Sequence, residues 1–286
     1  MLETILLPVD ITEIGQKAVE VAKNLAKKFG SKVWIITVLE NPKIPFLDEL
    51  PEEEKKAIVS LQEKINEKAK EILNQYVRQL KEEGIDANYD ILKGDTVETI
   101  LDFSEKIHPS LIVIPSHNKT DIEIKALGSV SLRVASKSNY PVLVLKGKQP
   151  LNFKKILVSY DFLHSSQKAL EFAVSIAKSF NSKLIVVHAD NDFGHSHIKS
   201  IMEKVKQRKL EKLNEIKSLY PDTDIYMEEG TPEHVIIKKA NEEDVDLIVI
   251  GKRQVSQTKR VFIGSTSYKI LKESNVSVLV YRGNHE

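Results

Sequence analysis

The sequence predicts an α/β fold of two tandem, doubly wound domains, each a five-stranded parallel sheet flanked by helices. The chain has 286 residues, which is enough for two domains. Its second half repeats the order of the first, because residues 5–40 match residues 156–190 and residues 94–116 match residues 230–252. Within each half, short apolar runs alternate with longer amphipathic segments, which is typical of parallel strands joined by helices.

The repeat also indicates where the domains divide. Asp10 aligns with Asp161, and Ala18 with Ala169, at a constant offset of 151 residues. Later the offset falls to 136 residues, so the first half carries about 15 more residues between its second strand and its second helix. We predict domains over residues 1–147 and 152–286.

Each half opens with a buried strand, followed by a helix that lies on the sheet. Residues 4–9 and 155–160 are short apolar runs that end next to an aspartate, as buried parallel strands do. Apolar residues then recur at the spacing of one helix face. They are Ala18, Val21, Ala22, Leu25, Ala26 and Phe29 in the first half, and Ala169, Phe172, Ala173, Ile176, Ala177 and Phe180 in the second.

The remaining elements follow in the same order in both halves. A second strand, a charged helix, a weaker third strand, a short helix, a fourth strand, another helix and a last strand complete each domain. The predicted strands are residues 32–38, 87–92, 111–114 and 141–145, and residues 183–189, 224–229, 247–250 and 277–281. The predicted charged helices span about 52–83 and 198–219, and the short ones 96–106 and 232–241.

Composition excludes several classes of protein. The formal net charge of +1 gives no electrostatic basis for binding nucleic acid or a membrane surface. The absence of cysteine excludes disulfides and thiolate metal sites. No apolar segment approaches the roughly 20 residues that a membrane-spanning helix needs, and residues 1–10 lack the pattern of a signal peptide. We therefore expect a cytoplasmic protein.

Ordered blocks of sequence carry a family resemblance. The segments ILLPVDITEIGQKA (5–18), LIVIPSH (111–117) and LGSVSLRVASKSNYPVLVLK (127–146) resemble a universal stress protein domain of the UspA-like kind, and the second half resembles another. The resemblance implies the strand order 3-2-1-4-5 and, in nucleotide-binding members, a loop G-x2-G-x9-G-[ST] after the fourth strand that holds ATP. It also implies that members dimerise through the last strand.

The spacing of this loop occurs twice, but its residues are only partly kept. The positions read Pro115, Asn118, Gly128 and Ser129 in the first half, and Gly251, Gln254, Gly264, Ser265 and Thr266 in the second. A phosphate cradle needs backbone N–H groups and close approach, which glycine provides and proline does not. The second half is therefore the better candidate. An alternative for the Gly-Ser pairs is a helix cap without a ligand, since serine is a preferred N-cap residue.

Other residues near the loop favour or oppose binding in the second half. Lys252, Arg253, Lys259 and Arg260 could offer positive charge to a phosphate. Tyr160 and Phe162 flank Asp161, where a ring would stack on adenine or fill its pocket.

The resemblance assigns further contacts at the strand ends. The family's aspartate contacts the nucleoside, which implies this role for Asp10 and Asp161, and the alternative is an aspartate that binds its own strand-to-helix turn. The residues at the end of the second strand, Val38 and Ala189, would meet the adenine edge through their backbone.

Metal binding and catalysis have weaker sequence support. His188, Asp190, Asp192, His195 and His197 fall within residues 188–197 and are possible metal ligands, but their spacing matches no known signature and the first half lacks them. His117 and His164 lie near the proposed sites as candidate bases. No phosphate-binding G-x-x-x-x-G-K-[ST] loop or G-x-S-x-G nucleophile elbow is present. We expect no catalytic residues and no enzyme activity.

Two functions remain open. One is an adenine-nucleotide-binding stress protein. It binds ATP, with or without Mg²⁺, and partner proteins recognise its nucleotide-bound state. The other is a nucleotide-free interaction scaffold with degenerate loops. In either case we expect the apolar last strands, residues 142–145 and 278–281, to pair as an internal pseudo-dimer, because exposed apolar edges are rarely left bare. A homodimer of two chains is a further expectation.

Overall fold

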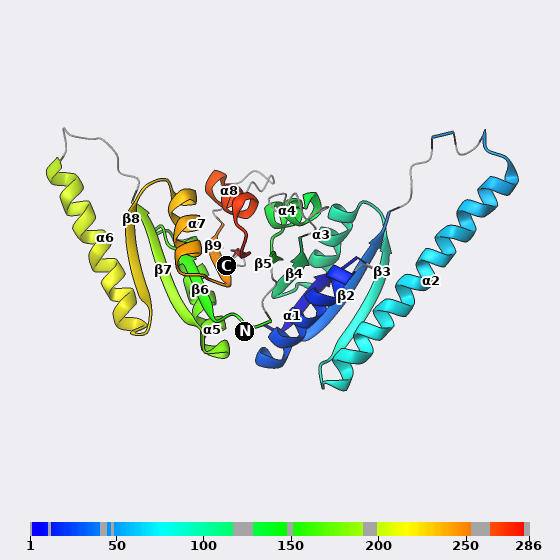
Figure 1. The fold of residues 1–286 in the computed structure, drawn as a ribbon, viewed down its shortest axis with the longest axis horizontal. Coiled ribbons are helices and arrows are strands. Elements are labelled where there is room, and N and C mark those ends of the chain that lie inside the picture. Colours follow the sequence, from blue (N-terminus) through cyan, green and yellow to red (C-terminus); the bar gives the residue numbers. More distant parts are fainter. Residues whose placement is uncertain are drawn as a thin grey trace. The chain divides into compact units, whose positions relative to one another are not determined.

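Figure 1 shows the computed structural model of the chain as a ribbon. The structure describes residues 2–10, 13–40, 45–46, 49–116, 128–147, 151–190, 199–252 and 264–282. The chain divides into two compact units, Met1–Pro115 and Ser116–Glu286. In both units parallel strands are joined by helices, and the second unit also contains one antiparallel pair, β5 with β10. The boundaries of the duplicated domains stay a prediction from the repeat.

The first unit is a parallel sheet with its helices. Its strands are β1 (Thr4–Pro8), β2 (Lys32–Leu39), β3 (Ala87–Lys93) and β4 (Leu111–Pro115), in the order β3-β2-β1-β4. β1 pairs in parallel with β2 on one side and β4 on the other, and all of β4 is buried. β1 and β4 are the near-continuous apolar runs that a sheet covered on both faces requires, whereas β3 at the edge is only partly buried.

Three helices follow the strands of this unit, namely α1 (Glu13–Phe29), α2 (Glu52–Glu82) and α3 (Thr96–Ile107). α1 buries the predicted stripe, including Ala18, Ala22 and Leu25. α2 buries residues only from Ala69 onward, and its first four turns are mostly exposed. It has 31 residues, against 21 in its counterpart α6 (Lys199–Leu219), so much of the extra length of the first half is helix rather than loop.

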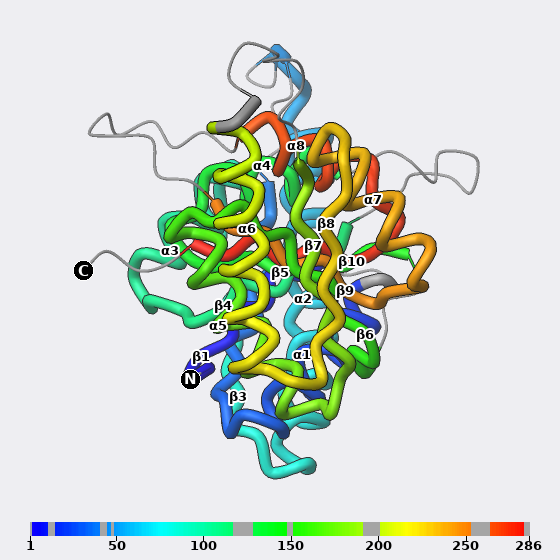
Figure 2. The backbone as a smooth tube through the Cα atoms, turned by 90° about the vertical axis from the view of Figure 1, so that its left-hand side faces the viewer, coloured from blue at the N-terminus to red at the C-terminus, as the bar shows by residue number. Residues whose placement is uncertain are grey.

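The second unit contains the rest of the chain. Its strands are β5 (Val142–Leu145), β6 (Lys155–Ser159), β7 (Lys183–Asp190), β8 (Asp224–Glu229), β9 (Leu247–Gly251) and β10 (Ser277–Tyr281). Its helices are α4 (Ser129–Lys137), α5 (His164–Phe180), α6, α7 (Pro232–Glu242) and α8 (Ser265–Glu273). Figure 2 traces how the chain leaves β7, runs through α6 and returns to β8.

The strand order of the second unit is β5-β10-β9-β6-β7-β8. From β10 to β8 all pairs are parallel, which for the second half gives the order 5-4-1-2-3, the predicted order 3-2-1-4-5 seen from its other edge. The predicted α/β fold class is confirmed. β6 and β9 are neighbours, so the change in strand order lies between them, where ligands of open α/β sheets bind.

The last strands of the two halves pair antiparallel. Val278 lies opposite Val144, Leu279 opposite Leu143, and Val280 opposite Val142. These side chains are buried, and the pairing covers the edges that the apolar sequences of β5 and β10 would otherwise expose. No helix in the described part of the chain is long and apolar enough to cross a membrane.

Candidate functional site

The predicted residues of the second half lie at the carboxyl ends of neighbouring strands. Asp161 follows β6, Ala189 is the next-to-last residue of β7, and Gly251 ends β9. Because β6 pairs with both β7 and β9 in parallel, these three positions share one edge of the sheet. Gly264, Ser265 and Thr266 form the start of α8, which follows β9 in the chain.

Asp161 organises the turn between β6 and α5. Its Oδ1 accepts a hydrogen bond from the backbone N–H of Leu163 (3.1 Å), and its own N–H donates to Oγ of Ser166 (3.2 Å). This is the local role that an aspartate plays in a strand-to-helix turn. The nucleoside contact implied for Asp161 stays a prediction, and the two roles are compatible because a carboxylate accepts several hydrogen bonds.

Three aromatic rings pack together beside Asp161. The Phe162 ring centroid lies 5.2 Å from that of Tyr160 and 4.6 Å from that of His188, both in edge-on geometry. Phe162 reaches this position with a left-handed backbone (φ 63°), which is unusual for a residue with a large side chain. Tyr160 is buried, so only the half-buried Phe162 offers ring surface to a ligand.

His188 and Asp190 are the described members of the candidate metal ligands at residues 188–197. Each has a partner, but Nε2 of His188 is buried with no hydrogen-bond partner among the described residues. Nδ1 of His188 lies 2.9 Å from the carbonyl oxygen of Tyr160, and Lys209 of α6 donates to Asp190 Oδ1 at 3.0 Å. Burial lowers the pKa of His188, so the ring is neutral at pH 7 and Nδ1 carries the donated proton. Asp192, His195 and His197 lie outside the described residues, within which no metal-binding group of three such side chains occurs.

Gly251 has a packing role that the sequence did not reveal. A Cβ atom at this position would lie 2.5 Å from the carbonyl oxygen of Ser165 and 2.8 Å from the backbone nitrogen of Ser166. Both atoms belong to the first turn of α5. Displacing helix backbone to make room for a Cβ would cost considerable free energy. Glycine is therefore needed here for β9 to lie against α5, whether or not a ligand approaches.

The start of α8 is open with respect to the described residues. Gly264 is the N-cap residue (φ −63°, ψ 155°), no side chain in the described part of the chain caps the helix, and a Cβ at Gly264 would meet no described atom within 4 Å. Ser265 is exposed and stands one residue inside the helix, so the expectation that serine caps it is wrong. The backbone angles of Gly264 are ones that any residue can adopt, so they do not by themselves require glycine.

One backbone N–H at the start of the equivalent helix of the first half is already occupied, although no described side chain caps that helix either. Gly128, the N-cap of α4, donates its backbone N–H to Oγ of Ser116 at 3.2 Å. Ser129 is exposed in the first turn of α4. Ser116 aligns with Lys252, which is buried and cannot act in the same way (3% exposed). No described residue accepts a hydrogen bond from the N–H of Gly264.

Lys252 does not point at a phosphate site. Its Nζ donates to the carbonyl oxygens of Ala135 (3.3 Å), Ser136 and Ser138 (3.4 Å) at the carboxyl end of α4. A buried ammonium group needs such acceptors, and a helix carboxyl end supplies them. The expectation that Lys252 supplies charge to a nucleotide is therefore wrong. Asn118, Gln254, Arg253, Lys259, Arg260 and His117 lie outside the described residues.

The first-half candidates divide between the two compact units. Asp10 and Val38 belong to the first unit, and Gly128 and Ser129 to the second. Asp10 follows β1, and a Cβ at Gly15 would lie 2.7 Å from its carbonyl oxygen, so the chain turns tightly into α1. Val38 is half-buried in β2. Pro115 ends β4 and lacks an N–H to donate.

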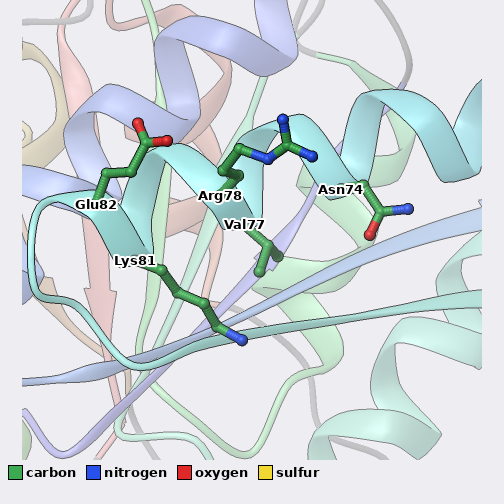
Figure 3. Close-up of a pocket in the computed structure, with 5 residues that line it drawn as sticks. All are labelled: Asn74, Val77, Arg78, Lys81 and Glu82. Carbon is green, nitrogen blue, oxygen red and sulfur yellow. The ribbon is translucent and has the colours of Figure 1, made fainter.

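One pocket of the first unit lies away from these residues. It has a volume of about 470 Å³ and is formed along the carboxyl-terminal half of α2 (Figure 3). The residues that line it are Asn74, Val77, Arg78, Lys81 and Glu82. None of them is a predicted site residue, and all belong to one helix, so the pocket is a shallow feature of the α2 surface.

Comparison with known proteins agrees with this fold and arrangement. The universal stress protein family model matches residues 1–146 and again residues 152–282. A universal stress protein of Methanocaldococcus jannaschii is 33% identical over 142 residues, covering 50% of this chain and 81% of that protein. One of Bacillus subtilis is 31% identical over 147 residues, covering 46% of this chain and 99% of that protein.

Among solved structures, a universal stress protein from Archaeoglobus fulgidus matches with a TM-score of 0.73 at 27% identity and covers 98% of each chain. A universal stress protein from Pseudomonas aeruginosa shares the fold at 19% identity with a TM-score of 0.72, covering 98% of this chain and 93% of that one. This chain belongs to the universal stress protein family and carries two of its domains in tandem.

Proposed function

We propose that this tandem universal stress protein binds an adenine nucleotide, ATP with or without Mg²⁺, in its second half. We further propose that it signals through the bound state and has no strong catalytic activity. The observation that carries the proposal is the first turn of α8 at Gly264, which is open among the described residues. α8 follows β9 in the chain, and β9 borders β6 at the point where the strand order changes, where nucleotide-binding members of the family hold ATP.

The first turn of α8 has the features that an anion site requires. Its backbone N–H groups have no side-chain cap, and its first turn contains no acidic residue. An uncapped helix start favours negative charge through its N–H groups and the helix dipole. The open space beside Gly264 lets a phosphate approach the backbone closely. We assign the phosphates to Gly264, Ser265 and Thr266.

We assign the nucleoside to the neighbouring strand ends. Asp161 would contact the ribose, and the backbone of Ala189 the adenine edge, as the family resemblance implies. Phe162 stands beside Asp161 and is the one ring of the aromatic cluster with exposed surface, so we assign it to the face of the base.

A nucleotide-free scaffold is the second candidate, and one observation favours it. Tyr160, Phe162 and His188 fill space with their own rings beside Asp161, and Lys252 directs its charge to α4. A scaffold would keep the fold and its strand pairing while these side chains occupy the former pocket.

Calorimetric titration of the full chain with ATP, in the presence and absence of Mg²⁺, separates the two functions. The proposal predicts saturable binding, together with nucleotide released from the denatured protein and identified by mass spectrometry. The absence of both a binding heat at millimolar ATP and co-purified nucleotide would support the scaffold.

A further inference from the structure

Lys252 connects two parts of the second compact unit that are far apart in sequence. Its backbone N–H donates to the carbonyl oxygen of Tyr281 (2.9 Å) at the end of β10, next to Gly251 at the end of β9. Its side chain extends to the last carbonyls of α4, more than 110 residues earlier in the chain. One residue therefore contacts both the strand that leads into the proposed nucleotide site and a helix of the other half.

The contact with α4 is fully enclosed. Lys252 is 3% exposed, and its ammonium group is satisfied by backbone carbonyls rather than by a carboxylate. Arg282, at the end of β10, also donates to Ser138 (3.3 Å), so two cations share the carboxyl end of α4. Such an arrangement is specific in geometry, because each carbonyl must lie within hydrogen-bonding distance of a fixed nitrogen.

A similar lysine lies on the other side of the β5–β10 pair. Lys146, just after β5, donates to the carbonyls of Leu271 and Ser274 (2.6 Å) at the carboxyl end of α8. Each half thus satisfies the end of the last helix of the other. The two lysines differ in one respect, because Lys252 follows β9 and precedes the proposed phosphate site, whereas Lys146 follows a terminal strand.

Gly251 places Lys252 beside the first turn of α5. A Cβ at Gly251 would lie 2.5 Å from the Ser165 carbonyl oxygen, so β9 packs closely against that turn. The neighbouring Ser166 accepts a hydrogen bond from the N–H of Asp161 at 3.2 Å, and Asp161 is the proposed nucleoside contact. The Lys252 N–H is bonded to Tyr281 and its Nζ to α4, so described residues connect Asp161 through the end of β9 to α4.

We propose that Lys252 is a positioning residue that links the second-half nucleotide site to the carboxyl end of α4. The proposal rests on the nucleotide binding proposed above. It adds that nucleotide binding in the second half changes the stability of α4, a helix of the first half. Thermodynamic linkage requires the effect to be reciprocal: ATP stabilises the Lys252–α4 contact, and loss of that contact weakens ATP binding.

The test compares Lys252→Met with Lys146→Met in the full chain. Both changes remove a buried ammonium group from helix carbonyls on either side of the same strand pair, so the second controls for lost stability. The first measurement is the Kd for ATP. We expect Lys252→Met to weaken binding roughly fivefold or more, the lower range of allosteric coupling, and Lys146→Met to leave the Kd within about twofold of wild type.

The second measurement is amide hydrogen exchange of peptides covering residues 134–140, with and without ATP. Linkage predicts that ATP slows exchange there in the wild type and in Lys146→Met but not in Lys252→Met. If the role of Lys252 were only structural, Lys252→Met would raise the amide exchange of residues 134–140. ATP would then still slow that exchange as it does in the wild type. If Lys252→Met does not fold, the wild-type measurement decides alone, and unchanged exchange in saturating ATP overturns the proposal.

The outcomes separate the two proposals. ATP binding of equal strength in the wild type and Lys252→Met, with no ATP-dependent protection of residues 134–140, rejects the linkage and leaves nucleotide binding intact. Protection confined to residues 128–133 and unaffected by Lys252→Met places the ligand in the first half and also rejects it. A wild-type chain that binds no adenine nucleotide rejects both.

Discussion

The backbone N–H of Gly128 donates to the hydroxyl of Ser116 at 3.2 Å, and the duplicated position of that serine in the second half is Lys252. The hydroxyl therefore uses the N–H that a phosphate would need at the start of α4. In the second half, the lysine side chain bonds to α4, and no described atom would lie within 4 Å of a Cβ at Gly264. This difference makes the second half the better candidate for nucleotide binding, on grounds independent of Pro115.

Gly251 and Gly264 are predicted to respond in opposite ways to a small side chain. Gly251→Ala forces a Cβ to within 2.5 Å of the Ser165 carbonyl oxygen, and we expect a loss of about 1–3 kcal/mol in the free energy of unfolding, as for other overpacked sites. Gly264→Ser adds a preferred N-cap residue in open space, so its free energy of unfolding stays within about 0.5 kcal/mol of wild type or rises. Urea denaturation measures both, and equal losses would contradict the packing role of Gly251.

The two buried lysines make stability depend on pH. Burial, with a smaller effect of the Arg282 charge, lowers the pKa of Lys252 to about 7, and burial lowers the pKa of Lys146 to about 8. In the unfolded chain both lysines titrate near 10.5. Between about pH 7 and pH 9.5 the unfolded state therefore binds more protons than the folded state, and the free energy of unfolding rises with pH.

The slope of that rise is at most about 1.4 kcal/mol per pH unit for each lysine. Below about pH 6 both lysines are charged in both states, and their contribution no longer changes with pH. Lys252→Met should flatten the profile between pH 7 and 8, where Lys146 contributes less. Urea denaturation at pH 7, 8 and 9 checks this, and a wild-type free energy of unfolding that falls over this range would contradict it.

Pairing of β5 with β10 predicts that the separated halves associate. Expressed alone, residues 1–147 and 152–286 would each expose an apolar edge strand, β5 or β10, whose side chains are buried in the full chain. We expect mixing to give a complex by analytical ultracentrifugation. Leu143→Lys, which replaces a buried partner of Leu279, should abolish it. Halves that stay monomeric together at high concentration would show that the strand pairing is too weak to hold them.

Much of the fold could be read from the sequence, because its signals are local or repeated. The apolar run before Asp161 and the helical spacing of Ala169 and Ala173 each specify one element, and the duplicate in the first half confirms the pattern. The bounds of α2 also agree with the predicted 52–83, although its first turns are mostly exposed and gain little from packing.

The site was harder to predict because its decisive contacts join distant segments. Gly251 was recognised as glycine-specific, but its partner, the backbone of Ser165, has no sequence signature. The position of Lys252 in the sequence suggests a positive charge near a phosphate, and only the antiparallel pairing of β5 with β10 brings α4 within reach of its side chain. The alignment of Ser116 with Lys252, a hydroxyl replaced by a cation, adds to Pro115 and Gly251 as a difference between the two loops.

The central claim is that ATP binds at the start of α8, and paired glycine variants test it most directly. In a thermal-shift titration with Mg-ATP, a one-site ligand at 100 times its Kd stabilises the fold by about 2.7 kcal/mol. Gly264→Val places a branched side chain where the phosphates approach, in space that is open without ligand, so the fold should survive while the ATP-induced shift disappears. Gly128→Val is the matched control and should keep the shift. A shift lost only with Gly128→Val, or kept in both variants, would contradict the account.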